Sequence, residues 1–390
     1  MQQKLERKAP RLARFLKEIE IQFKWLFIWL FLKVLTGPSR RRNKPLNPQS
    51  VKSVLILRQD KIGDMVVTLP TIHTLRYHRR DISIGVLASA VNYKIIEHDA
   101  AVARVHIWRK SLPKIIKTVR EIRKCNYDAV IDLMTGTSVT SLVIAMLCAP
   151  RAYRIGIAKE SFRKYYDYYT LEKMNHAHKL HITEMFRATL EPLGIKLANG
   201  VTECKIALSE KQQERGRQLA EQIRDLRFDA LIMLNVSAGK LDRTLSFDKF
   251  VKLVGVLSSK FPRLQFLISY APNEERLART ALEAGSENVS LLPSGVSIME
   301  LIALMNYFQA VVSVDTSICH IAANLNVPLL AMYNGNNFNF SRWYPYSKRV
   351  WIVRSPDWKS VDGITFEQLS AAVDNFISDL SSLSVLKKVQ

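Results

Sequence analysis

The amino-acid sequence predicts an α/β protein built from two doubly wound domains, each a parallel sheet with helices on both faces. Three observations support this fold class. The chain has 390 residues, of which 48% are hydrophobic, and this is enough to fill two cores. Short apolar runs alternate with segments of helical periodicity, as expected for strands joined by crossover helices. The alternation occurs twice, with a polar, basic interruption over residues 159–181.

The predicted strands form two series. The first comprises Val54–Leu57, Ile82–Leu87, Val105–Trp108, Ala129–Leu133 and Tyr153–Ile157, and the second Ala230–Leu234, Gln265–Ser269, Val289–Leu292, Ala310–Val314 and Pro328–Tyr333. Between them we predict a helix over Ile182–Leu193 that Gly194 ends. We therefore expect a basic segment with a linker (1–49), a first Rossmann-like domain (50–200), a second one facing it across a cleft (201–365) and a C-terminal helix (366–390).

The first fifty residues are strongly basic and partly apolar. They carry twelve Lys and Arg against three Glu, and their apolar residues recur at helical spacing. The apolar run Trp25–Leu32 is much shorter than the roughly 20 residues that span a bilayer. We therefore expect a basic amphipathic helix that lies on an anionic membrane surface through residues 11–44. The alternative is a helix packed on the protein's own core.

Charge and cysteine content restrict the classes of binding partner and the cellular compartment that fit this chain. The formal net charge is +22, which favours anionic partners such as phosphorylated lipid, nucleotide sugar or nucleic acid. The four cysteines are far apart and contain no C-x-x-C pair, so neither a disulfide framework nor a thiolate zinc site is indicated. A reducing cytosol fits this pattern.

The first predicted strand leads into the segment RQDKIGDMVVTLP, which contains Gly63 and Asp64. Doubly wound sheets bind ligands at this carboxyl edge. A single glycine does not form the G-x-G-x-x-G fingerprint of dinucleotide binding. It instead favours a tight turn that displays a carboxylate. Asp64 has the chemistry of a general base for an attacking hydroxyl. The alternative is an acid that only stabilises the start of a helix.

Two segments of the second half combine small residues with polar groups. After Ala230–Leu234, the turn NVSAGKLDRTLSFDKF offers the backbone of Ser237 to Gly239 and the cations Lys240 and Arg243 to a pyrophosphate. A solvated basic loop has the same composition. The segment VVSVDTSICHIAANLNVPLLAMYNG predicts a helix that begins near Ile318 after a buried strand, and such a start attracts phosphate. In that segment the polar residues are Asp315, Thr316, Ser317 and His320. His320 alone is also typical of a core or capping histidine.

The interruption over residues 159–181 mixes cations with tyrosines. Arg163 and Lys164 precede four tyrosines between Tyr165 and Tyr169. Such a patch suits phosphorylated sugars, and it also suits single-stranded nucleic acid. The nearby histidines His176, His178 and His181 lack the acid of an H-E-x-x-H motif, and the chain contains no D-x-D motif. We therefore expect no metal site.

Two motifs resemble the heptosyltransferase family, glycosyltransferase family nine. GDMVVTLP resembles the family's G-D-x-x-x-T-x-P, and DTSICHIAA resembles D-[ST]-G-x-x-H-x-A-A. The resemblance implies the two-domain GT-B fold, an ADP-heptose donor, inversion at the transferred sugar and no metal cofactor. It implies Asp64 as the catalytic base. It also implies donor contacts by Ser237, Gly239, Lys240, Arg243, Glu274, Asp315, Thr316, Ser317 and His320, and acceptor contacts by Lys61, Gly63, Arg163 and Lys164.

The sequence departs from the family pattern at several positions. Ser317 stands where the family has glycine, which puts donor affinity or identity in question. Arg243 matches the family's cation better than Lys240 does, judged from its spacing to Phe250. Leu245 and Ser246 stand near the family's usual Trp-Pro, so the match is loose and leaves Lys240 as the alternative cation. Glu274 lies where the family often binds the ribose, but a surface helix start at PNEER is the favoured explanation of the same residues.

The resemblance implies an enzyme that transfers heptose to the inner core of lipopolysaccharide, and together with the basic amino-terminal segment it implies a peripheral location on the cytoplasmic face of a bacterial inner membrane. Its partners would be a nucleotide sugar, the lipopolysaccharide core and the anionic membrane, and no nucleic acid is expected. Two alternatives remain. One is a related transferase that uses another nucleotide sugar or a protein acceptor. The other is a non-catalytic, membrane-attached binder of RNA or acidic glycolipid.

Overall fold

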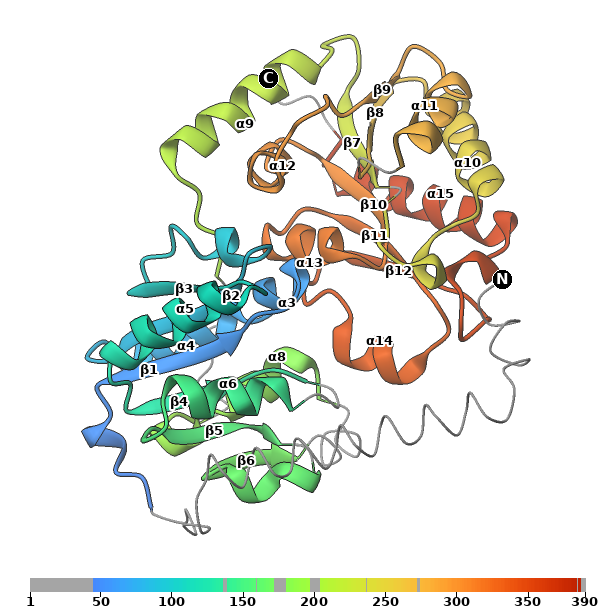
Figure 1. Cartoon of the computed structure of the whole chain (residues 1–390). Coiled ribbons are helices and arrows are strands. Elements are labelled where there is room, and N and C mark those ends of the chain that lie inside the picture. Colours follow the sequence, from blue (N-terminus) through green and yellow to red (C-terminus); the bar gives the residue numbers. More distant parts are fainter. Residues whose placement is uncertain are drawn as a thin grey trace.

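The computed structural model describes residues 45–135, 139–158, 160–171, 180–196, 204–235, 237–271, 274–383 and 385–386. Within these residues the chain forms two α/β domains that lie side by side (Figure 1). The membrane segment predicted over 11–44, the histidines His176 and His178, and the boundary predicted near residue 200 fall outside them. In this part of the chain, no helix combines the length and apolarity needed to cross a bilayer.

Each domain contains one parallel sheet, as predicted. The first sheet consists of β1 (Ser53–Arg58), β2 (Ser83–Ser89), β3 (Arg104–Trp108), β4 (Ala129–Asp132), β5 (Tyr153–Ala158) and β6 (Tyr168–Leu171). The second consists of β7 (Ala230–Asn235), β8 (Leu264–Ser269), β9 (Val289–Leu291), β10 (Ala310–Val314), β11 (Leu329–Tyr333) and β12 (Val350–Arg354). The orders β3-β2-β1-β4-β5-β6 and β12-β11-β10-β7-β8-β9 are the same doubly wound topology twice.

Helices connect the strands in both domains. Those of the first half are η1 (Pro48–Ser50), α3 (Ile62–Val66), α4 (Leu69–His78), η2 (Tyr93–Ile95), α5 (Leu112–Lys124), α6 (Thr140–Cys148), η3 (Glu160–Tyr165), α8 (Ile182–Ala188) and η4 (Glu191–Leu193). Those of the second half are α9 (Glu210–Ile223), η6 (Leu241–Arg243), α10 (Phe247–Lys260), α11 (Glu275–Glu283), α12 (Ile298–Met305), α13 (Ser317–Asn324), α14 (Asn337–Trp343), η8 (Val361–Gly363) and α15 (Phe366–Ser382).

The hydrophobic core explains how the two domains are held together. Along β1, Val54 and Ile56 face a cluster that includes α4 and α8, while Leu55 and Leu57 face α5 and α6. The first of these clusters continues through α13 and α12 to one face of the second sheet. A separate cluster under α10 and α15 covers the other face of that sheet. The two domains therefore share buried apolar surface rather than meeting only through a linker.

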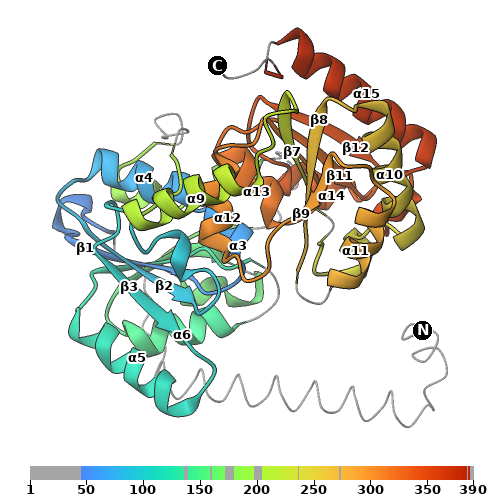
Figure 2. The same cartoon turned by 90° about the horizontal axis from the view of Figure 1, so that it is seen from above.

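The carboxyl edges of the two sheets face each other. Helix α3 follows β1, helix α13 follows β10, and the two helices are in contact at the centre of the molecule (Figures 1 and 2). Both strands lie at the point where the strand order of their sheet reverses, which is where doubly wound domains bind ligands. The fold therefore joins the two motif-bearing turns in one place.

The predicted strands are present, with ends that differ by one or two residues, but two edge strands were not predicted. β6 lies in the basic, aromatic stretch that was interpreted as polar, and β12 follows the last predicted strand. The predicted helix over Ile182–Leu193 is α8 followed by the separate turn η4, and Gly194 ends that turn with a φ of 81°. Helix α13 begins at Ser317, one residue before the predicted start.

Candidate active site at the contact of α3 and α13

The turn after β1 places Asp64 in the first turn of α3. Its Oδ1 atom accepts a hydrogen bond from Arg58 Nη2 at 3.1 Å, and its Oδ2 atom accepts one from the Lys61 backbone N–H at 3.3 Å. The Asp64 side chain is 20% exposed, and Lys61 beside it is also exposed. The carboxylate is therefore held in one orientation at the sheet edge while part of it still reaches solvent.

Arg58 organises this turn, and the sequence analysis did not single it out. It is the last residue of β1 and its side chain is fully buried. Its guanidinium donates to the Leu133 carbonyl at 2.6 Å, lies over the Phe186 ring at 4.7 Å, and pairs with Asp60 at 3.2 Å as well as with Asp64. An arginine that ends an otherwise apolar strand was the available signal, because arginine is almost never fully buried unless it is paired.

Asp60 is the second carboxylate on Arg58. Burial raises the pKa of Asp60 to about 6, the Arg58 charge opposes this shift, and the Asp64 charge adds to it. Its Oδ1 atom is buried and has no hydrogen-bond partner among the described residues. One guanidinium therefore neutralises two neighbouring carboxylates, of which Asp60 is the costlier to ionise.

The end of β2 fixes the backbone of the same turn. Asn92 is buried, and its Nδ2 atom donates to the Arg58 carbonyl at 2.9 Å and to the Lys61 carbonyl at 3.2 Å. Ser89 Oγ donates to the Asp60 carbonyl at 2.8 Å. These side chains satisfy carbonyls that a tight turn leaves without backbone partners, and so they stabilise the shape of the turn.

The turn after β10 builds the facing half of the site. Thr316 caps α13 by accepting the Ile318 N–H on its Oγ1 atom at 3.2 Å, and Ser317 is the first residue of the helix. Asp315 is buried and pairs with Arg243 at 3.1 Å. Burial raises the pKa of Asp315, and the Arg243 charge is the largest of the opposing effects. Thr316 accepts both the Ile318 N–H and, on its backbone carbonyl, the Cys319 N–H. What the helix start offers beside the Arg243 guanidinium is therefore mainly the positive end of its dipole.

The loop after β7 contributes that arginine. Asn235 Nδ2 donates to the Ser237 carbonyl at 3.0 Å and to Thr316 Oγ1 at 3.4 Å, which ties the loop to the α13 turn. Gly239 has a φ of 64°, and a Cβ atom there would meet no atom within 4 Å. Arg243, not Lys240, forms the ion pair with Asp315, while Lys240 is exposed and its charge also lowers the pKa of Asp315. Both predicted cations thus act on the same site.

Gly63 is where the two halves touch. A Cβ atom on Gly63 would lie 3.0 Å from His320 Cδ2 and 3.3 Å from Ser317 Cα. His320 is buried in this contact, and burial lowers its pKa to about 4, with the Asp64 charge opposing the shift. The imidazole is therefore neutral near pH 7. The turn that carries Asp64 on α3 and the start of α13 are consequently close neighbours.

Gly63→Ala is expected to reduce the rate of the sugar transfer that the resemblance implies by about tenfold, because the added methyl group separates α3 from α13 by a few tenths of an ångström and misplaces the two halves. The measurement is kcat with both substrates saturating. Gly255→Ala in α10 is a matched control, since its Cβ would lie 3.0 Å from the Ala284 carbonyl, away from the site. Equal losses in both variants would contradict a specific role for the α3–α13 contact.

His181 also joins the two domains, and not through a metal. Its Nδ1 atom accepts the Thr183 N–H at 3.2 Å and its Nε2 atom donates to the Tyr344 carbonyl at 2.8 Å, so both ring nitrogens are engaged. Burial lowers the pKa of His181 to about 4. Among the described residues, no three His, Cys, Asp or Glu side chains are grouped as metal ligands. Independence from metal remains a prediction.

The remaining predicted residues lie outside this contact. Glu274 directly precedes α11, as the surface-helix interpretation expected, yet its Oε2 atom is buried without a hydrogen-bond partner in the described part of the chain. Arg163 and Lys164 are exposed on η3. In the part of the chain that the structure describes, no hydrogen bond or ion pair joins them to the Asp64 turn. Tyr166, in the same stretch, is buried and donates to Asp132 Oδ2 at 2.7 Å, so this tyrosine supports the fold.

A family model and similar curated proteins point to the same protein family. The family model described as glycosyltransferase family 9 (heptosyltransferase) matches residues 115–366, more than half of the chain, including the segment from Asp315 to His320. The chain is 24% identical over 307 residues to lipopolysaccharide heptosyltransferase 3 of Escherichia coli K12, covering 74% of this chain and 83% of the relative. It is 19% identical over 302 residues to the lipopolysaccharide core heptosyltransferase OpsX of Haemophilus influenzae, with coverages of 75% and 82%.

Solved structures show the same fold. A glycosyltransferase of family 9 from Veillonella parvula superposes with a TM-score of 0.71 at 16% identity, covering 87% of this chain and 99% of that one. The Escherichia coli heptosyltransferase WaaC with ADP superposes with a TM-score of 0.66 at 22% identity, with coverages of 84% and 99%. At these identities the similarity establishes the two-domain arrangement and leaves the roles of individual residues to the chemistry of the site.

Proposed function

The chain belongs to glycosyltransferase family 9, the heptosyltransferase family, and from that premise we propose that it transfers heptose from ADP-heptose to the inner core of lipopolysaccharide. The names of the relatives support this substrate class, since two of them are lipopolysaccharide heptosyltransferases. The single observation that carries the proposal is the contact of α3 with α13, which sets the Asp64 carboxylate beside a helix start with a paired arginine.

Asp64 acts as the general base of a single displacement. The acceptor hydroxyl gives its proton to the carboxylate while its oxygen attacks the anomeric carbon of the heptose. The bond from that carbon to the phosphate oxygen breaks at the same time, and the electron pair leaves with ADP. Attack from the face opposite ADP inverts the configuration. The fixed orientation of Asp64 by Arg58 and the exposed part of its side chain suit this role.

The second domain stabilises the departing ADP. The positive end of the α13 dipole and the charges of Arg243 and Lys240 offset the negative charge that grows on the pyrophosphate, so no metal ion is needed. Asp315 and His320 line the same contact on the sugar side, and Ser237 and Gly239 shape the loop. The buried, unpaired Glu274 Oε2 atom suits a ribose hydroxyl.

The first domain receives the acceptor. Lys61, beside the base, and the exposed pair Arg163 and Lys164 match the phosphates of a lipopolysaccharide core. We further propose that the enzyme works peripherally on the cytoplasmic face of the inner membrane, with residues 11–44 as a lipid-binding segment.

Incubation of the purified full chain with ADP-heptose and a truncated lipopolysaccharide tests the proposal. The expected product is heavier than the acceptor by one heptose, as measured by mass spectrometry, and forms equally in the presence of a chelator. Parallel reactions with other nucleotide sugars and with a protein acceptor cover the alternative transferases. Product from another donor, or none from any donor together with tight RNA binding, would reject the proposal.

A further inference from the structure

Helix α5 carries an unusual concentration of positive charge on the surface of the first domain. The segment from Arg104 to Lys124, which includes β3 and α5, contains eight Lys and Arg against the single acid Glu121, a net charge of +7. The whole chain of 390 residues has a net charge of +22. About a third of the net charge is thus concentrated in 21 residues, more than a uniformly basic surface would place there.

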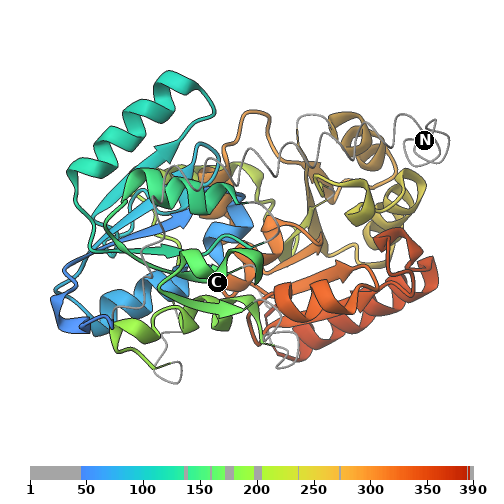
Figure 3. The ribbon, with the colours of Figure 1, turned by 60° about the horizontal axis from the view of Figure 1, so that its bottom comes forward.

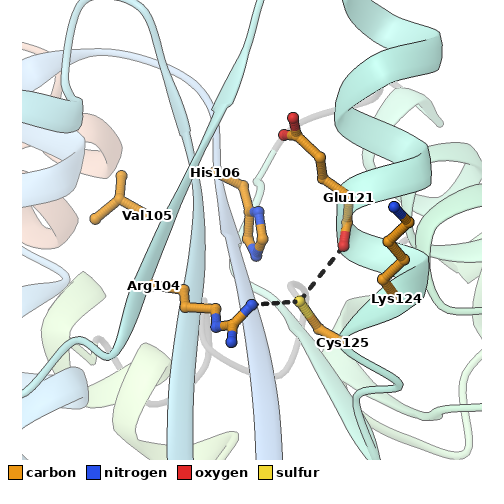
Figure 4. Close-up of a pocket in the computed structure, with 6 residues that line it drawn as sticks. All are labelled: Arg104, Val105, His106, Glu121, Lys124 and Cys125. Atoms are coloured by element: carbon orange, nitrogen blue, oxygen red, sulfur yellow. Dashed lines mark hydrogen bonds between the residues drawn. The ribbon is translucent and has the colours of Figure 1, made fainter.

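Most of these cations have no carboxylate partner. Lys117 lies 4.0 Å from Glu121, whereas the described residues provide no ion pair for Lys114, Arg120 or Lys124. Arg104 and Lys124 also line a pocket of about 370 Å³ between β3 and α5, where the Arg104 guanidinium contacts the Cys125 sulfur (Figure 4). The positive field of this surface is therefore not neutralised locally.

Two large aliphatic side chains lie on the same face. Leu112 is 69% exposed and Ile116 is 42% exposed, although the opposite side of α5 is packed through Thr118 and Ile122. Leu112, Ile116, Arg120 and Lys124 follow one another at four-residue spacing and so form one ridge of the helix. Exposed aliphatic residues within a cationic helix face are typical of helices that lie in the headgroup layer of a membrane.

The ridge is also placed at the working edge of the domain. Parallel register puts Ile107 of β3 level with Ala88 of β2 and Arg58 of β1. The residues just beyond, including Leu112 at the start of α5, therefore lie at the same sheet edge as the Asp64 turn, two strands or about 10 Å along it. Helix α5 itself lies on the outer side of its domain, away from the second domain and α15 (Figures 2 and 3).

We propose that the exposed face of α5 docks on an anionic lipid bilayer, with Leu112 and Ile116 inserted between headgroups and the surrounding cations paired with lipid phosphates. A lipid-linked acceptor, as proposed above, would then meet the enzyme close to its base. Lipid binding itself does not depend on the proposed function, because it requires neither donor nor acceptor. Nucleic acid is the competing anionic partner, and only a bilayer gives the aliphatic pair a place to be buried.

A charge-reversal pair tests the docking surface in the full chain. The variant Lys114→Glu, Lys117→Glu, Arg120→Glu is compared with Lys205→Glu, Lys211→Glu, Lys348→Glu, three exposed lysines of the second half. Both variants change the net charge equally and retain residues 11–44. Affinity for vesicles of phosphatidylethanolamine and phosphatidylglycerol, in about a 3:1 ratio, is expected to fall at least about tenfold in the α5 variant and less than about twofold in the control.

Equal affinities of the two variants would overturn the proposal, because residues 11–44 or total charge would then account for binding. Tight binding of a single-stranded oligonucleotide without vesicle binding would overturn it too. A second variant, Leu112→Ser with Ile116→Ser, keeps every charge, and we expect its vesicle binding to be lost at high salt, where wild type is retained. Unchanged salt resistance would exclude insertion of these side chains. Thermal unfolding of each variant confirms that the domain is folded.

Discussion

Asp64→Asn is expected to reduce the transfer rate by a factor of about 100 to 10,000, the range that a general base contributes. The amide has nearly the shape of the carboxylate, and its oxygen still accepts the hydrogen bond from Arg58 Nη2. It has no capacity to take the acceptor proton. Because Asp64 lies on α3 and the phosphate-binding groups lie on α13, ADP affinity should change less than about twofold.

The measurement combines kcat at saturating substrates with the ADP dissociation constant from calorimetry. Asp81→Asn is a suitable control. Asp81 lies in the loop before β2, at the opposite edge of the sheet from Asp64, and it pairs with Arg79 and Lys52. Wild-type turnover in Asp64→Asn would exclude Asp64 as the base. A parallel loss of ADP affinity would assign its charge to the donor instead.

The sequence was most informative where strands are fully buried. Every residue of β7, β8, β10 and β11 is buried, so these strands appear as mostly apolar runs that end in polar turns, with Gln265 and Ser313 as internal polar residues. That pattern was sufficient to place Asp64 and Asp315 at sheet edges. The missed strand β12 is at a sheet edge and has no fully buried residue, although its residues Val350 to Val353 form an apolar run that the prediction passed over. β6 is also an edge strand, and its short YYTL sequence lies in a polar stretch that hid it.

Contacts between distant segments could not be predicted in the same way. Three hydrogen bonds around the site join residues that are 31 to 163 positions apart in the sequence. They run from Arg58 to Leu133, from Asn92 to Lys61 in the Asp64 turn, and from His181 to Tyr344. Such contacts depend on how strands are ordered and domains are docked, and local periodicity carries no information on either. Family resemblance suggested the role that we propose for Asp64, whereas the supporting residues emerged only from the fold.

Arg58→Met is expected to lower the free energy of unfolding by about 3–5 kcal/mol at pH 8, because it removes the only cation that the described residues pair with either Asp60 or Asp64. Methionine retains apolar contact with Phe186 but leaves two carboxylates and the Leu133 carbonyl without the guanidinium. The loss should depend on pH. Burial raises the pKa of Asp60 to about 6 while Arg58 opposes the shift, so removing Arg58 raises this pKa further.

Below that pKa Asp60 is protonated and needs no cation, so the loss should be much smaller at pH 5 than at pH 8. Adding Asp60→Asn to Arg58→Met should recover more than half of the lost free energy of unfolding at pH 8, because it removes one of the two carboxylate charges left without a cation. Urea unfolding of both variants at the two pH values measures this. A loss that is equal at pH 5 and pH 8, and that Asp60→Asn does not relieve, would attribute the effect to packing of the arginine stem rather than to its charge. In that case the ionisation of Asp60 would not depend on Arg58, and the ion pair between the two would contribute little to stability.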